Sequence, residues 1–225
     1  IGKEVSKRLA ECGVHLVLVS NKTDELKEVK KELDTYNVDI LDIALDVRNK
    51  GEVDSMVDKA VSQFGKVDIL VNNAGVTFFG GVEECTEEEW DLTLNTNVKG
   101  YFLLSKAVLP YMKEKKSGTI INMSSIWGKK GSATMAAYST SKFAVEGLTN
   151  SLEEEVKPYG VKVSSIILDK VDTPFRDNMV HKVNFSDEQK EKMIAASDVA
   201  DSVLWVLESS ERSLPSSITL NAFQW

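Results

Sequence analysis

The chain has 225 residues, of which 42% are hydrophobic and 28% are charged, a composition typical of globular proteins and unlike that of disordered, collagen-like or coiled-coil chains. Its 27 basic and 35 acidic residues give a net charge of −8, and no basic stripe offsets the acidic excess. This charge argues against nucleic acid and anionic membranes as partners.

Apolar residues at helical spacing alternate with short apolar runs along the chain. In chain order, the pattern predicts helices around residues 5–12 and over 23–33, 52–64, 87–116 (as one helix or two), 133–157 and 198–208. It predicts strands over 15–19, 38–47, 67–71, 119–123, 161–168 and 217–223, with an irregular segment over 169–197. Because the strands are continuously apolar and alternate with helices, we expect an α/β fold, a doubly wound parallel sheet in a single domain spanning residues 1–225.

The numbers of cysteines and histidines bear on the cellular compartment and on metal binding. Cys12 and Cys85 cannot make a disulfide framework, and the longest apolar stretches fall far short of the roughly 20 residues that cross a bilayer. We therefore expect a cytoplasmic protein with reduced thiols and no membrane partner. With only two histidines, no histidine-built metal site is expected.

The segment Asn72-Asn73-Ala74-Gly75 follows the third predicted strand. The carboxyl edge of a doubly wound sheet is where such folds bind ligands, and small residues let a ligand approach the backbone. An ordinary Asn/Gly turn explains the same residues equally well.

Tyr138 and Lys142 lie four residues apart on a predicted helix, which places the ammonium beside the phenol. A nearby cation favours the phenolate, and so brings a phenol of pKa about 10 closer to the pH at which it exchanges protons. The spacing alone is weak, because the chain has a second copy in Tyr111 and Lys115. Only the first copy has a hydroxyl, that of Ser125 at a strand end, thirteen residues before its tyrosine.

Four motifs in this order and spacing resemble those of the short-chain dehydrogenase/reductase family, and the resemblance covers essentially the whole chain. They are Asn72-Asn73-Ala74-Gly75, Asn97-Val98-Lys99-Gly100, Ser124-Ser125 and Tyr138-Ser139-Thr140-Ser141-Lys142. The resemblance implies a Rossmann-like fold and an oxidoreductase that interconverts a carbonyl and a secondary alcohol, such as a ketone or a 3-oxo or 3-hydroxy acid. In this family Tyr138 would be the acid/base, Lys142 would lower its pKa and hold the nicotinamide ribose, Ser125 would bind the substrate oxygen and Asn97 would support a proton-relay water.

The same resemblance assigns contacts to a nicotinamide cofactor. Asp46 and Val47 would receive the adenine, and Val171 and Thr173 would contact the carboxamide and phosphate. The remaining positions are the ribose loop and the last two residues of the family's glycine-rich phosphate loop: Asn73, Ala74, Gly75, Ile1 and Gly2. We expect a strand and the rest of that loop to precede Ile1 in the natural protein, with the strand in the middle of the sheet.

The end of the first predicted strand bears on the choice between NADP and NAD. An acidic residue there would bind the ribose 2′-hydroxyl and repel a 2′-phosphate, whereas this chain has Ser20, Asn21 and Lys22. We therefore expect a preference for NADP(H), with NAD(H) as the alternative. A solvated lysine at a helix start is an equal interpretation of Lys22.

One departure from the family's pattern bears on the function. Leu168-Asp169 stands where the family often has Pro-Gly, which favours a second hypothesis, a cofactor-binding sensor or scaffold without turnover. The family likeness also implies a homodimer or homotetramer formed through the helices over 97–116 and 133–157.

Overall fold

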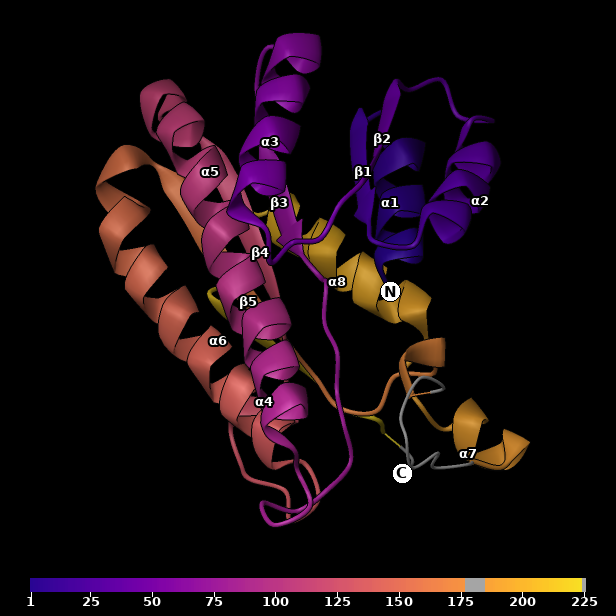
Figure 1. The fold of residues 1–225 in the computed structure, drawn as a ribbon. Coiled ribbons are helices and arrows are strands. Elements are labelled where there is room, and N and C mark those ends of the chain that lie inside the picture. Colours follow the sequence, from indigo (N-terminus) through magenta and orange to yellow (C-terminus); the bar gives the residue numbers. More distant parts are fainter. Residues whose placement is uncertain (177–184, 224–225) are drawn as a thin grey trace.

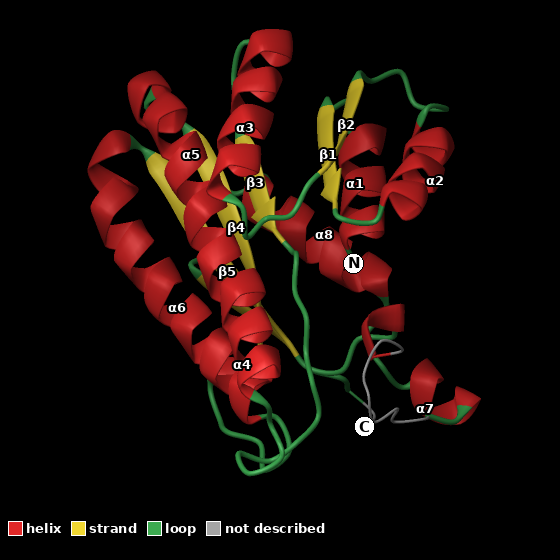
Figure 2. Cartoon of the chain, in the orientation of Figure 1, coloured by secondary structure: helices red, strands yellow, loops and turns green. Residues whose placement is uncertain are grey.

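The computed structural model describes residues 1–176 and 185–223, in which every paired strand is parallel to its neighbour (Figure 1, Figure 2). The strands are β1 Leu16–Ser20, β2 Ile40–Ala44, β3 Ile69–Asn72, β4 Gly118–Ser125, β5 Val161–Leu168 and β6 Ser217–Leu220. The helices are α1 Gly2–Glu11, α2 Thr23–Leu33, α3 Lys50–Phe64, α4 Glu87–Leu94, α5 Gly100–Lys115, α6 Ala136–Val156, α7 Asp187–Glu191 and α8 Ala196–Leu207. Helices thus connect parallel strands, as the alternating sequence pattern predicts.

The strands form two separate sheets, β1-β2 and β3-β4-β5-β6. A cavity of about 1840 Å³ separates them, and it is lined by Val17 and Val19 of β1 and by Leu70 and Val71 of β3. The facing edges of β1 and β3 therefore have no neighbouring strand among the described residues.

Two apolar cores cover the two faces of the sheets. One packs α1 and α8 against the strands, with Leu9 and Val203 among its buried members. The other packs α3, α5 and α6 against the opposite face, and these three helices lie in front of the four-stranded sheet in Figure 1. The neighbouring residues Ile120 and Ile121 are fully buried in different cores, so β4 is covered on both faces, as its continuously apolar sequence requires.

The long helical region over 87–116 is interrupted at one place. Between α4 and α5, residues Asn95–Lys99 form a turn of π-helix, a wider turn that is frequent at functional sites. The Thr86 hydroxyl caps α4 by accepting a hydrogen bond from the Glu89 amide at 3.1 Å. Helical spacing in the sequence predicts the helix but does not reveal the extra residue in this turn.

Most element bounds agree with the sequence pattern. Helix α2 and strand β5 have the predicted bounds, whereas β2 is shorter than the predicted 38–47 and β6 ends at Leu220 instead of residue 223. The segment over 169–197 is irregular as predicted, with a 3-10 turn at Pro174–Arg176 and the short helix α7 in its described part.

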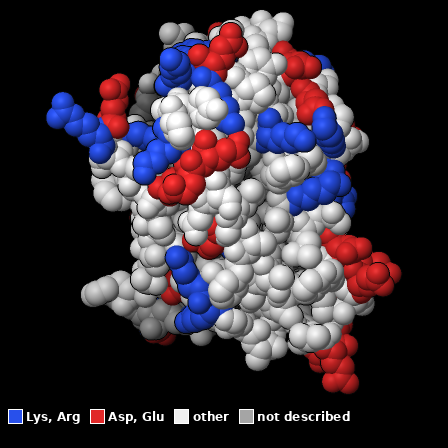
Figure 3. Space-filling view, turned by 90° about the vertical axis from the view of Figure 1, so that its left-hand side faces the viewer, with Lys and Arg blue, Asp and Glu red and all other residues white. Residues whose placement is uncertain are grey.

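The surface carries mixed charge. On the face drawn in Figure 3, basic and acidic side chains are interspersed over the upper part. Within residues 1–176 and 185–223, no helix combines the length and the apolar character needed to cross a membrane.

The core position of Ile121 provides a test of the fold. Ile121→Ala would leave a cavity between β4 and the α8 side of the core, and we expect the free energy of unfolding to fall by about 2–5 kcal/mol. Val82, which is 82% exposed, is the control, since Val82→Ala should change it by less than about 0.5 kcal/mol. Urea denaturation measures both. Equal, small losses would contradict the packing described here.

Candidate active site

The cavity lies between β1 and β3 along their length and continues over the carboxyl ends of β4 and β5. It brings together nearly all the side chains that the sequence singles out. Among the residues that line it are Ile1, Gly2, Ser20, Asn21, Lys22, Asp46, Val47, Asn73, Ala74, Gly75, Ser125, Tyr138, Lys142, Val171 and Thr173. Asn97 is the one predicted site residue outside this lining. Segments far apart in the sequence, from Ile1 to Thr173, meet here, because parallel strands end at the same edge of a sheet.

Tyr138 and Lys142 lie on the same face of α6, one turn apart. Both are nearly buried, with 9% and 4% of their surfaces exposed. The Lys142 ammonium donates a hydrogen bond to the Met123 carbonyl of β4 at 2.8 Å and lies 5.5 Å from the centroid of the Tyr138 ring. The helix therefore presents the phenol and the cation together to the cavity, as their i, i+4 spacing predicts.

Burial lowers the pKa of Lys142 from 10.5 to about 8, while the carboxylate of Glu146, one turn along α6, acts in the opposite direction. Desolvation disfavours the charged form of an amine. The ammonium consequently remains charged below about pH 8 and loses its charge in the mildly alkaline range.

Ser125 ends β4 and is 5% exposed at the start of the 3-10 turn Ile126–Gly128. Its hydroxyl accepts a hydrogen bond from the Trp127 amide at 3.3 Å. Gly128 closes this turn against α6, where a Cβ atom would come within 2.8 Å of the Lys142 carbonyl oxygen. Only glycine therefore lets the turn that carries Ser125 pack so closely on the helix that carries Tyr138.

Asn97 lies in the π-helical turn and is fully buried. Its Oδ1 accepts from the Val76 amide at 2.8 Å, and its Nδ2 donates to the Val76 carbonyl at 2.9 Å and to the Ser141 hydroxyl at 3.0 Å. Ser141 in turn donates to the Tyr138 carbonyl at 2.7 Å. The side chain thus fixes the loop after β3 to α6, and its role in a water relay stays a prediction.

At the opposite end of the cavity, the charged side chains are already paired. Lys22 forms an ion pair with Glu25 at 2.7 Å, and its amide donates to the Ser20 hydroxyl at 3.1 Å. Arg48 Nε donates to both carboxylate oxygens of Asp46, at 2.8 and 2.9 Å, and this pairing holds the Asp46 pKa below its ordinary value. Lys22 therefore does behave as a lysine at a helix start, although it also lines the cavity.

The loop after β5 closes the cavity on the side of Tyr138. Val171 forms an isolated parallel bridge with Ile194, and the Asp169 amide donates to the Leu220 carbonyl at 3.0 Å. Leu168-Asp169 thus continues in register beside β6. Further along, the Phe175 ring lies 6.2 Å from the Tyr138 ring, centroid to centroid, at an interplanar angle of 53°. Residues 177–184 of the irregular segment over 169–197 lie outside the part of the chain that the structure describes.

Comparison with known proteins agrees with this architecture. The model of the short-chain dehydrogenase family matches residues 1–184. The chain belongs to this family. It is therefore an NAD(P)-dependent oxidoreductase with the α/β fold predicted from the sequence.

The similarity to individual proteins extends over nearly the whole chain. An uncharacterised oxidoreductase of Staphylococcus epidermidis is 33% identical over 221 residues, which are 98% of this chain and 90% of the relative. A metagenomic short-chain oxidoreductase solved in complex with NADP is 27% identical, with a TM-score of 0.83 over 98% of this chain and 91% of the other. An NAD⁺-bound xylitol dehydrogenase is 25% identical, with a TM-score of 0.88 over 98% of this chain and 93% of the other.

Several partners in this short-chain dehydrogenase were not singled out from the sequence. Arg48 follows Asp46 and Val47 directly, and Glu25 lies one helical turn after Lys22, so simple spacing could have indicated both ion pairs. Phe175 had no such signal, because its approach to Tyr138 depends on the path of the irregular segment after β5.

The hydrogen bonds of Asn97 to Val76 predict that this side chain stabilises the loop after β3. Asn97→Ala would leave the amide and carbonyl of Val76 without these partners, and we expect a loss in the free energy of unfolding of about 2 kcal/mol or more. Hydrogen exchange at the Val76 amide should become faster. Asn95→Ala, in the same π-helical turn, serves as the control. Unchanged Val76 exchange in the Asn97 variant would show that the loop is held by other contacts.

Proposed function

We propose that this oxidoreductase interconverts a small carbonyl compound, such as a ketone or a 3-oxo acid, with its secondary alcohol, and that it prefers NADP(H). The observation that carries the proposal is the nearly buried pair Tyr138 and Lys142, facing one cavity together with Ser125. A phenol beside an ammonium group is suited to exchange one proton with an alkoxide.

Each of the three side chains has a distinct role in this proposal. The hydroxyls of Ser125 and Tyr138 hydrogen-bond the substrate oxygen and stabilise the negative charge that develops on it. Tyr138 donates its proton as the alkoxide forms, and the charged Lys142 stabilises the phenolate left behind. A bound nicotinamide supplies the hydride for reduction and accepts it in oxidation. Asn97 acts as a positioning residue through Ser141 and the Val76 loop.

The lining of the cavity suits an extended nicotinamide nucleotide. We assign Asp46 and Val47 to the adenine end, Asn73, Ala74 and Gly75 to the central part, and Tyr138 and Lys142 to the nicotinamide end. We assign Ile1 and Gly2 to the central part as well, since a Cβ atom on Gly2 would come within 2.9 Å of the side-chain nitrogen Nδ2 of Asn73. We assign Val171 and Thr173 to the nicotinamide side.

The NADP preference is supported by the polar groups that follow β1. Ser20, Asn21 and Lys22 offer hydrogen-bond donors and one cation where an acidic side chain would repel a 2′-phosphate. Because Lys22 is paired with Glu25, a phosphate must compete with that carboxylate, which would weaken the preference.

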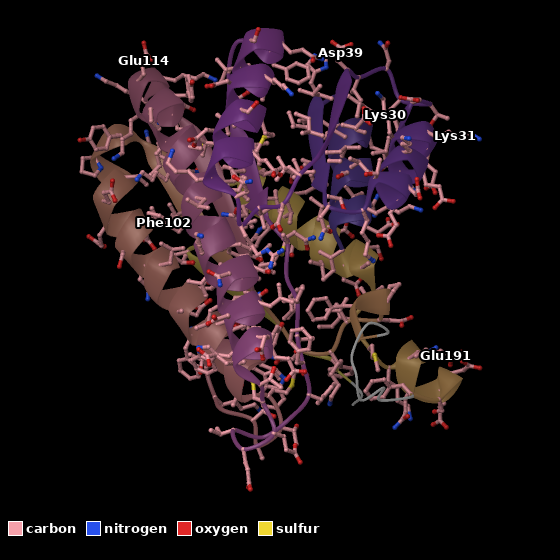
Figure 4. All side chains as sticks on the ribbon, in the orientation of Figure 1. Lys30, Lys31, Asp39, Phe102, Glu114 and Glu191 are labelled. Atoms are coloured by element: carbon pink, nitrogen blue, oxygen red, sulfur yellow. The ribbon has the colours of Figure 1, made fainter. Side chains whose placement is uncertain are left out.

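We also propose that residues 1–225 act as one domain in a cytoplasmic homodimer or homotetramer. Phe102 of α5, labelled in Figure 4, is 45% exposed, and Phe143 of α6 is 48% exposed. Exposed aromatic side chains on neighbouring helices are typical of a surface that a second subunit covers.

The role of Tyr138 is tested by Tyr138→Phe, which removes the transferable proton and keeps the ring. We expect turnover to fall by at least about a thousandfold while NADPH binding, measured by its fluorescence, is retained. Tyr111→Phe is the matched control, because Tyr111 and Lys115 repeat the spacing on α5 but Tyr111 contacts Asp58. Near-normal turnover of Tyr138→Phe would refute the assigned role.

The role of Lys22 is tested by comparing the two cofactors. Lys22→Ala should raise the KM for NADPH by about tenfold, since a charged hydrogen bond to phosphate is lost, and should leave the KM for NADH almost unchanged. Glu25→Gln frees Lys22 and should lower the KM for NADPH. Equal changes for both cofactors in either variant would remove the basis for the proposed preference.

A further inference from the structure

Tyr101 is fully buried on α5, one helical turn after Asn97. Its hydroxyl lies 3.3 Å from the Met123 carbonyl oxygen of β4, to which it donates a hydrogen bond. The same carbonyl accepts the hydrogen bond from Lys142. Two donors from different helices thus meet at one acceptor, which has a lone pair for each.

The rings around Lys142 complete this arrangement. The Lys142 ammonium lies 5.5 Å from the Tyr101 ring centroid and 5.5 Å from that of Tyr138, within the range of a cation–π interaction. Lys142 has no carboxylate within ion-pair distance in the part of the chain that the structure describes. A buried ammonium without an ionic partner needs other favourable contacts to remain charged.

We propose that Tyr101 is a positioning residue that holds the Lys142 ammonium in place beside Tyr138, through its ring face and through the shared Met123 carbonyl. The proposal rests on the proposed function, because the charge on Lys142 is useful only if Tyr138 exchanges a proton. A tyrosine that merely fills the core would give the same burial, but removing its ring would leave the ionisation of Lys142 unchanged.

Several charged and titratable groups around Lys142 can affect its ionisation, and a test must distinguish the effect of Tyr101 from theirs. Tyr101 faces it from α5, and Tyr138 and Glu146 lie on its own helix, while β4 contributes the Met123 carbonyl. Glu146 is itself held by Lys129 at 3.5 Å and by the Ser165 hydroxyl at 3.3 Å. A substitution at Tyr101 leaves the other groups in place, so a shift in the titration midpoint of Lys142 reports on Tyr101.

The direct test follows the Lys142 Cε chemical shift against pH in the full chain labelled with carbon-13 lysine, with Lys142→Met to assign the signal. The wild type should titrate near pH 8. Tyr101→Leu removes the ring, and we expect the midpoint to fall by about half a pH unit or more. Tyr101→Phe keeps the ring but loses the hydrogen bond to the Met123 carbonyl, and it should restore most of the lost midpoint. Val108→Ala, a core change on the same helix, controls for a general loss of packing.

A midpoint in Tyr101→Leu that stays near the wild-type value or rises would overturn the proposal. The pH profile of kcat/KM is the second measurement, and its alkaline limb should move to lower pH in Tyr101→Leu together with the Lys142 midpoint. If Lys142 shifts as expected but the wild type reduces no carbonyl compound, the proposed function fails and the contact stands. If the wild type is active and Lys142 does not shift, Tyr101 is an ordinary core residue.

Discussion

The buried ammonium group of Lys142, at the carboxyl edge of the sheet, depends on favourable contacts from the structure around it. Lys142 is 4% exposed and is held by a carbonyl of β4. Desolvation of such a group is costly, and it lowers the pKa of Lys142 to about 8 against the opposing effect of Glu146. Burial of the cation suits an oxidoreductase, because in a low-dielectric site its electrostatic interaction with a neighbouring phenol is stronger than in water.

The fold supplies the contacts by which this edge is kept rigid. Strand β4 is covered on both faces and carries both Met123 and Ser125, so the carbonyl that accepts from Lys142 and the hydroxyl of Ser125 belong to one strand. Gly128 brings the following turn against α6, and the buried Asn97 fixes the loop after β3 to the same helix through Ser141. The end of β4 with its turn, the loop after β3 and the π-helical turn of Asn97 are therefore all in contact with the helix that carries Tyr138.

The sequence predicts most of the architecture because parallel strands and amphipathic helices have clear periods. The bounds of α2 and β5 agree to the residue, whereas the predicted strand over 38–47 is too long at both ends. Pairing with β1 covers only Ile40–Ala44, and Asp46 and Val47 beyond it line the cavity. The π-helical turn at Asn95–Lys99 is not visible in the sequence, because a wider turn changes the hydrogen bonds but not the apolar pattern. Contacts such as Phe175 on Tyr138 depend on an irregular path that no local rule predicts.

The central claim is that the cavity collects Ser125, Tyr138 and Lys142 for hydride transfer between a nicotinamide and a carbonyl carbon. It is tested most directly with NADPH that carries deuterium at the transferable position and a panel of ketones and 3-oxo acids. We expect deuterium to appear on the carbinol carbon of at least one product, in a single configuration. NADPH that binds but transfers no deuterium to any member of a broad panel would contradict it.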